Sequence, residues 1–305
     1  MKERILQTLR ALRAYALEKG YDISLFYHEE DSYLMRFANS AISLNTNEHL
    51  IRLEVEAYEG KKRASYELIT DLNKVDDIKQ AIDTAAELVK HAQPLNYQPT
   101  IAKYAESFED ETCYDAALAQ ISNEEKLQYF NAAVKGLETE DIKLSGIFSN
   151  GENIIAQINT RSEHTQFFRT SDAQVTVVLA SAKLKWEVNA EQSAQQKSDL
   201  NPASVRDELA FMLNHYQHDT PQQLPLGSYD IVFGSAAIAQ MLRFMGWIGF
   251  NGGAMKRGFS FMSEEKTGQK VFSDKMTLVD DPTRRETYPF KRDYLGMARE
   301  PFPLI

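Results

Sequence analysis

The chain has 305 residues and a net charge of −10 at pH 7. Its composition, 43% hydrophobic and 26% charged, is that of a folded globular protein and argues against a disordered chain. The negative field opposes nucleic-acid phosphates and anionic lipids, so we expect neither nucleic acid nor membrane as a partner. The length favours two domains over one.

The cellular compartment is predicted from what the chain lacks. Its single cysteine, Cys113, cannot form an internal disulfide, which fits a reducing environment. The first 20 residues are charged and amphipathic, without the apolar core of a signal peptide. No window offers the roughly 18 consecutive apolar residues that a spanning helix needs. We therefore predict a cytoplasmic protein.

The chain begins with a predicted helix. Apolar residues recur at helical spacing from Ile5 to Leu17, and Gly20 is placed to end the helix. Residues 21–70 then alternate with period two, which is typical of an antiparallel meander. Three polar groups in this stretch are interpreted as turns between strands: 29–31, 45–48 and 59–62.

The stretch 71–94 predicts a second helix. Asp71 is its expected N-cap, and Pro94 lies just past its end. The same order of elements then recurs. Ser122 and Glu125 form the signature of a capping box at the start of another helix. Alternating runs follow it, separated by polar groups that are again interpreted as turns: 149–153 and 169–172.

Placing Asp22 against Asp141 aligns helix with helix and strands with strands. We therefore predict an N-terminal domain at residues 1–195 that contains an internal duplication, with one copy at 1–95 and the other at 120–190. Residues 196–224 are predicted to form a linker and a helix, and residues 225–305 the start of a C-terminal domain.

The C-terminal domain is predicted to open with a strand at 229–233 and a helix capped by Ser235. The chain stops at "FPLI", inside a strand-like run, so this domain is expected to be incomplete. The fold class is therefore predicted as α+β: a duplicated helix-plus-antiparallel-meander N-terminal domain, followed by a second, mainly β, C-terminal domain that is truncated.

The helix after Ser235 has an apolar stripe from Ile238 to Met245, which we predict to face the core. Gly246 and Gly249 weaken this helix. Either close packing or a nearby ligand would account for them.

Residues that could bind a metal or act as a nucleophile are few. His215 and His218 lie three apart, but no third ligand can be named for a metal site. Cys113 lies in an acidic stretch, which raises the pKa of a thiol. The sequence around Ser260 lacks the final glycine of a nucleophile elbow. We therefore nominate no catalytic residue, no metal ligand and no cofactor.

Four stretches resemble the TldD/PmbA family, also called the modulator-of-DNA-gyrase or microcin-processing peptidase family. They occur in the family's order across both predicted domains: "RFANSAI" at 36–42, "GSYDIVFGSAAIAQML" at 227–242, "GFSFMSEEKTGQKVFSDKMTLVDDP" at 258–282, and "PF" at 289–290. The resemblance implies a cytosolic peptidase system of two paralogous subunits. One type carries a zinc-binding His-Glu-x-x-x-His helix, and the other lacks it and pairs with the first.

Carried over position by position, the resemblance places the first histidine of that zinc motif at Arg243, the glutamate at Phe244 and the second histidine at Ile248. A guanidinium is permanently cationic and has no lone pair to donate, and the other two side chains have no donor atom. The chain therefore resembles the zinc-free PmbA or TldE type. It departs from the family at residues 291–296, where members carry acidic residues and a Glu-Gly pair.

Three functions are consistent with these observations. The first is a non-catalytic subunit, a pseudoenzyme, that binds peptide or shapes the chamber of a zinc-bearing partner, with a second copy of itself as the other possible partner. The second is a self-sufficient hydrolase with an unrecognised site. The third is a protein-interaction module without a peptidase link.

The first hypothesis nominates four residues for peptide binding. Edge strands of the meanders can accept a peptide by strand addition. Arg36 and Asn39 would supply polar contacts, and Gly252 and Gly253 would allow close backbone approach. A solvent-facing strand explains the first pair equally well, and an ordinary turn explains the second.

Overall fold

The computed structural model describes residues 1–216, 222–266, 268–287, 290–293 and 295–305. The chain divides into two compact units, each considered by itself. Unit 1 consists of Met1–Pro94, Pro99–Thr220 and Arg292–Ala298. Unit 2 consists of Leu95–Gln98, Pro221–Lys291 and Arg299–Ile305.

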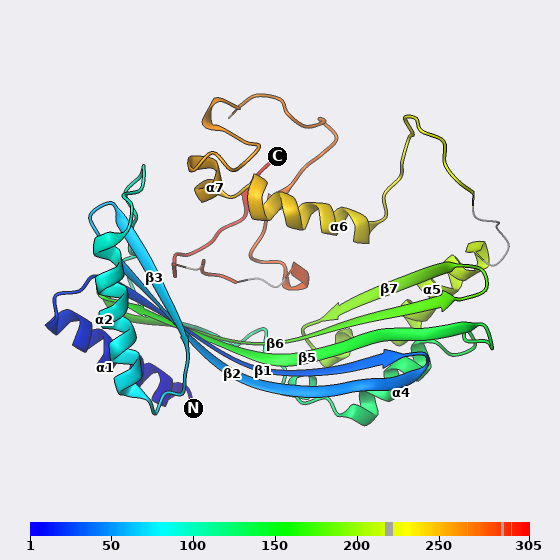
Figure 1. Cartoon of the computed structure of the whole chain (residues 1–305), viewed down its shortest axis with the longest axis horizontal. Coiled ribbons are helices and arrows are strands. Elements are labelled where there is room, and N and C mark those ends of the chain that lie inside the picture. The colour runs from blue at the N-terminus through cyan, green and yellow to red at the C-terminus, as the bar shows by residue number, and fades with distance from the viewer. Residues whose placement is uncertain (217–221, 267, 288–289, 294) are drawn as a thin grey trace. The chain divides into compact units, whose positions relative to one another are not determined.

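Unit 1 is built on one long, mainly antiparallel sheet with the strand order β3-β2-β1-β5-β6 (Figure 1). β7 and the short parallel strand β4 both pair with β6. The strands are β1 (Ile23–Ala38), β2 (Ala41–Glu59), β3 (Lys62–Ile69), β4 (Phe108–Asp110), β5 (Ile142–Asn159), β6 (Ser162–Ser181) and β7 (Trp186–Ala194).

The helices of unit 1 precede and follow each run of strands. They are α1 (Lys2–Glu18), α2 (Val75–His91), α3 (Ala116–Ala119), α4 (Asn123–Ala133), the 3₁₀ turn η1 (Lys197–Asp199) and α5 (Pro202–Tyr216). The mixed helix and strand content, with an antiparallel sheet, confirms the α+β class.

The predicted helix ends are confirmed in part. Gly20 has a φ of +73° after α1, and Ser122 and Glu125 form the capping box of α4. The N-cap of α2 is Lys74 and not Asp71, because the Asp71 carboxylate instead accepts the N–H of Asn73 at 2.8 Å in the turn before the helix.

Most of the predicted turns are wrong. Residues 59–62 do form the β2–β3 turn, but the other polar groups lie in the middle of continuous strands of 16 to 20 residues. The strand register brings them side by side, so that Asp31 pairs with both His49 and Glu152. We call this set the polar belt: 28–32 in β1, 45–49 in β2, 149–153 in β5 and 169–172 in β6.

Two hydrophobic cores lie on either side of the polar belt. Because side chains alternate along a strand, Leu25 and Met35 of β1 lie on the same face of the sheet. Leu25 belongs to a core with α1 and α2, and Met35 to a core with α3, α4 and α5. Figure 1 shows α1 and α2 at one end of the strands and α4 and α5 at the other.

The order of helix, three-stranded meander and helix occurs twice in unit 1, with β1 and β5 paired at the centre. That arrangement is what a duplication would produce. The internal duplication and the domain boundaries stay predictions.

Unit 2 contains α6 (Ser235–Phe244), the π-helical turn η2 (Met245–Gly249), α7 (Gly252–Lys256), the 3₁₀ turns η3 (Glu264–Lys266) and η4 (Arg285–Thr287), and strands β8 (Val279–Asp280) and β9 (Phe302–Pro303). β8 pairs with β9. The strand-rich character expected for residues 225–305 is not seen in the described residues, whose strands have two residues each.

Three local predictions for unit 2 are corrected. Residues 229–233 are irregular and not a strand, because no strand of the described residues pairs with them. Gly234, and not Ser235, is the N-cap of α6. The stripe predicted to face the core is only partly buried: Ile238 is 40% and Met241 42% exposed, while Leu242 and Met245 are half-buried.

One stability prediction follows from the core of unit 1. Phe130 of α4 is fully buried, and its ring centroid lies 4.0 Å from that of Phe37. We expect Phe130→Ala to lower the free energy of unfolding by about 3–5 kcal/mol, because it leaves a cavity between helix and sheet. The matched control is Phe211→Ala, since Phe211 is 68% exposed. Equal losses for both variants in urea denaturation would contradict this packing.

Candidate functional site

The positions that the resemblance assigns to the family's zinc motif lie where α6 passes into the π-helical turn. Arg243 and Phe244 end α6, and Ile248 lies in η2. The turn is marked by the N–H of Phe250, which donates to the carbonyl of Met245, five residues earlier, at 2.8 Å.

The π-helical turn accounts for the spacing of five between positions 243 and 248. In a regular α-helix, two residues five apart are rotated by about 140° and point to different sides. A π-helical turn holds more residues per turn, because its hydrogen bonds close over five residues. It therefore rotates these two positions toward the same side of the helix.

The side chains at these positions do not fit a zinc ion. Arg243 is exposed, Phe244 is 61% exposed and Ile248 is 41% exposed. A hydrolytic zinc needs nitrogen, oxygen or sulfur ligands and a base for its water. Among the residues that the structure describes, no three His, Cys, Asp or Glu side chains are grouped to hold a metal.

Arg36 and Asn39 lie at the end of β1. Asn39 has a φ of +51° and Ser40 a φ of +60°, so they form the two-residue turn of the β1–β2 hairpin. Such turns need positive φ at both central residues, and asparagine tolerates it. Arg36 is exposed opposite Leu44, beside a register shift in the ladder. Asn39 thus has a structural reason for its identity, and the peptide contacts of both residues stay predictions.

Gly252 and Gly253 are the first two residues of α7. A Cβ at Gly252 would meet nothing within 4 Å, and one at Gly253 would meet only the Asn251 Oδ1 at 3.2 Å. Gly249 is different, because a Cβ there would lie 2.2 Å from the ring of Phe261. Close packing therefore explains Gly249, and a peptide contact at Gly252 and Gly253 stays a prediction.

Some positions considered in the sequence fall outside the described residues: His218, Pro289 and Tyr294. His215 is described, and its ring centroid lies 4.9 Å from that of Phe211.

The polar belt contains a charged cluster that the sequence does not predict. In the sequence, Asp31, Glu152 and Arg169 are interpreted as residues of separate turns, and the structure brings them together on neighbouring strands. The His49 Nδ1 lies 2.7 Å from the Asp31 carboxylate, and its Nε2 lies 3.7 Å from Glu29. The hydrogen bond with Asp31 is the main reason that the pKa of His49 is raised. On the neighbouring strands, Arg169 makes two hydrogen bonds to Glu152, at 2.9 and 3.0 Å.

Lys126 is a second residue that the sequence analysis missed. It is 1% exposed on α4, and its Nζ lies 5.6 Å from the ring centroid of Tyr33 and 5.8 Å from that of Phe148. Burial lowers the pKa of this lysine to about 8. A signal was present in the sequence, because Lys126 shares the buried helix face of Tyr129 and Phe130, at spacings of three and four.

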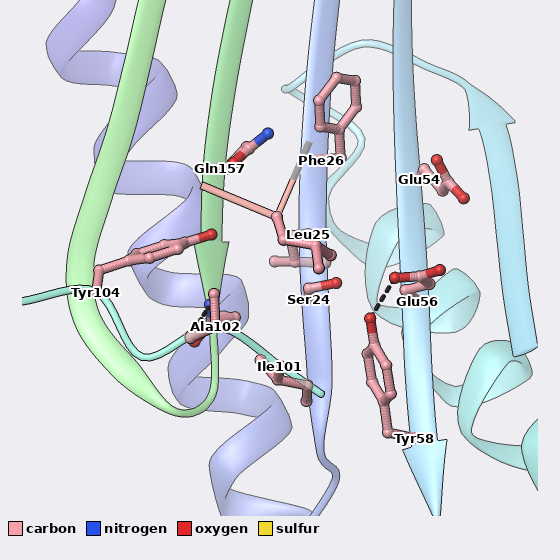
Figure 2. Close-up of a pocket in the computed structure, with 12 residues that line it drawn as sticks. Ser24, Leu25, Phe26, Glu54, Glu56, Tyr58, Ile101, Ala102, Tyr104 and Gln157 are labelled. Carbon is pink, nitrogen blue, oxygen red and sulfur yellow. Dashed lines mark hydrogen bonds between the residues drawn. The ribbon is translucent and has the colours of Figure 1, made fainter. Parts of the chain in front are cut away.

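A small cavity lies on the other face of the sheet, near the start of β1 (Figure 2). Ser24, Glu54, Tyr58 and Tyr104 are among its lining residues, and its volume is ≈ 20 Å³. That volume suits about one water molecule. Burial raises the pKa of Tyr104 to about 12, so its hydroxyl stays protonated at neutral pH. The cavity is too small for a peptide side chain.

Comparison with known sequences concerns the C-terminal part of the chain. Residues 226–305 match the family model described as PmbA/TldA metallopeptidase C-terminal domain. The chain carries a domain of the PmbA/TldD family. It is therefore related to the TldD/PmbA metallopeptidases, and Arg243, Phe244 and Ile248 lie inside the matched domain. No curated protein matches the sequence.

Solved structures of PmbA/TldD-like proteins share the fold of the whole chain. A candidate modulator of DNA gyrase from Thermotoga maritima superposes with a TM-score of 0.74 at 13% identity, covering 98% of this chain and 68% of its own. TldE from Thermococcus kodakarensis gives 0.73 at 15%, covering 98% and 67%. A candidate gyrase modulator from Bacteroides thetaiotaomicron gives 0.71 at 17%, covering 98% and 69%. These identities show the fold alone, and the family match concerns residues 226–305.

Within the described ranges, every helix is too short or too polar to cross a bilayer.

The geometry of the π-helical turn can be tested with metal-binding histidines. We expect Arg243→His/Ile248→His to bind Co²⁺ or Zn²⁺ at least about tenfold more tightly than a single histidine, because the turn brings the two rings to one side. The matched control is Ala236→His/Met241→His, which has the same spacing of five within regular α6. Titration followed by cobalt absorbance measures both. Equal affinities would show that the turn does not align the two positions.

The buried lysine has a pH-dependent effect on stability. The pKa of Lys126 falls from 10.5 to about 8 on folding, so the folded protein holds an unfavourable buried charge below pH 8. We expect Lys126→Met to stabilise the fold by about 1–3 kcal/mol at pH 7. The gain should shrink between pH 8 and 10.5, where the unfolded chain binds more protons than the folded one.

The control for this prediction is Lys135→Met, because Lys135 is exposed. It should change the free energy of unfolding by less than about 0.5 kcal/mol. A destabilised Lys126→Met protein, or a gain that does not depend on pH, would mean that the amino group has a partner in the fold.

Proposed function

We propose that this chain is a PmbA/TldE-type subunit of a cytoplasmic metallopeptidase system. It is itself non-catalytic, and it binds peptide or forms a chamber together with a zinc-bearing TldD-type partner. The observation that carries the proposal is the identity of the side chains at positions 243, 244 and 248 within the matched family domain.

Zinc hydrolysis needs three protein ligands, an open position for water and a base that activates the water. Arg243 would repel a divalent cation, and Phe244 provides no base in place of the family's glutamate. Ile248 adds no ligand. In this chain α6 and the π-helical turn bring positions 243 and 248 to one side of the helix, but the side chains there cannot bind zinc. That combination supports a subunit that depends on another chain for catalysis.

Exposed apolar side chains of unit 2 support an assembled state. Val232 is 99% exposed, Phe244 61% and Trp247 68%. The rings of Phe244 and Trp247 lie side by side, with their centroids 6.5 Å apart, and exposed groups of apolar side chains commonly mark interaction sites. The partner is the zinc-bearing paralogue in this proposal, and a second copy of the chain is the alternative. The net charge of −10 argues against nucleic acid.

The proposal is tested by mixing the full chain with a zinc-bearing TldD-type paralogue. We expect the two to co-elute in gel filtration, and peptide hydrolysis to require the paralogue and to stop when a chelator removes zinc. Trp247→Glu should weaken co-elution, because it places a charge in the apolar surface. Phe211→Glu is the matched control, since both side chains are 68% exposed.

Two results would replace the proposal with its alternatives. Hydrolysis by this chain alone that survives a chelator would mean a self-sufficient hydrolase. Failure to bind any zinc-bearing paralogue, together with stable binding to an unrelated protein, would mean an interaction module.

A further inference from the structure

The outer edge of β2 is open over part of its length. β2 pairs with β1 from Ala41 to Ala57, but its ladder with β3 covers only Arg52 to Glu59. Among the described residues, no strand pairs with the outer side of residues 41–51, and Ala41 to His49 are all exposed. This edge is part of unit 1 alone.

Two backbone hydrogen bonds show which groups point outward. The N–H of Thr70, just after β3, donates to the carbonyl of Ile51 at 3.0 Å, so the backbone groups of Ile51 face away from β1. The N–H of Tyr58 donates to Asp22, just before β1, at 2.9 Å, so the even-numbered residues face β1. Because successive residues of a strand face opposite ways, the odd-numbered residues of the open edge point outward. The outward residues are Asn45, Asn47 and His49.

Residues 45–49 of this edge have little protection against strand pairing beyond the charge of Glu48. Proteins block open edges with lysine, proline, a bulge or a covering segment. Residues 45–49 contain no lysine or proline. The register shift opposite Ser43 limits the open stretch at one end, and β3 limits it at the other. The result is an opening for one short strand.

The charges around the opening favour a basic occupant. Two exposed carboxylates contribute to the charge around this opening: Glu48 lies within it, and Asp71 follows β3. Asp31 lies behind His49, and the negative charges of both aspartates contribute to the raised pKa of that histidine. The cations in this region are Arg36, near the far end of the opening, and Arg4 and Lys74, whose charges act on Asp71. A second copy would bring the same carboxylates and would be repelled.

The two faces of the opening differ. On one face the neighbours of an added strand are Asn45, Asn47 and His49, and on the other they are Leu44, Thr46, Glu48 and Leu50. A strand that presents basic side chains to the second face would place their methylene groups over the leucines and their charges near Glu48.

We infer that the outer edge of β2 at Asn45–His49 binds extended peptides with alternating basic side chains, by adding them as a strand to the sheet. This inference rests on the proposed function for the class of occupant, a peptide, and adds its place and its sequence preference. Backbone hydrogen bonds supply the affinity, and the acidic surroundings supply the preference.

The experiment uses the full chain without a partner and a fluorescein-labelled, amidated heptapeptide of alternating lysine and valine. We expect saturable binding by fluorescence anisotropy, and at least about tenfold weaker binding by Asn47→Pro, which removes an outward N–H that the sheet does not use. The matched control is Ser65→Pro on the outer edge of β3, where we expect unchanged affinity. A melting curve of each variant checks folding.

Two further measurements leave the protein unaltered. A peptide with N-methyl groups on its valines should not bind, because it cannot complete the backbone ladder, and the glutamate–valine analogue should not bind, because of its charge. Amide exchange should slow at Asn45, Asn47 and His49 when the lysine–valine peptide is added, and not at Thr46 or Glu48.

The inference is overturned if Asn47→Pro binds the peptide as the unaltered chain does, or if the N-methylated peptide binds equally well. A concentration-dependent dimer that Asn47→Pro abolishes would also overturn it, by making a second copy the occupant. Because no zinc-bearing partner is present, these results are independent of co-elution and hydrolysis, which test the proposed function.

Discussion

The structure of unit 1 depends on a mismatch of length between its sheet and its helices. A strand of 20 residues such as β6 spans about 65 Å, while a helix of 17 residues such as α2 spans about 25 Å. The longer helices therefore cover the two ends of the strands, with α1 and α2 at one end and α4 and α5 at the other, as Figure 1 shows. The middle of the sheet is exposed along residues 45–49 of β2, while Asn150 and Ser171 of β5 and β6 are buried beside the segment that contains α3.

The polar belt occupies the stretch of sheet between the two hydrophobic cores. Its side chains satisfy one another across the strands, as Asp31 does with His49 and Glu152 with Arg169. The paired β1 and β5 join the two cores through this belt. The β2 edge is open for a separate reason, because the ladder of β3 with β2 ends at Arg52.

In unit 2 the backbone geometry of the π-helical turn and the chemistry of its side chains are two distinct features. The turn rotates positions 243 and 248 toward one side of the helix, and the side chains at these positions have no group that can bind zinc. The same segment exposes the apolar side chains of Phe244 and Trp247. Both features are consistent with a unit whose function is completed by contact with another surface.

The sequence by itself determined what depends on neighbours along the chain. The helix ends at Gly20 and at the Ser122–Glu125 capping box are set by local hydrogen bonding and backbone conformation, and the sequence predicted both. The proposal of a zinc-free subunit also rests on side chains read from the sequence, those at 243, 244 and 248. Only the tertiary structure decided whether a polar segment such as 149–153 is a turn or the middle of a strand, because that depends on strand register between distant residues. The same holds for the burial of Lys126 and the exposure of Ile238, since burial is set by which distant elements pack against a helix.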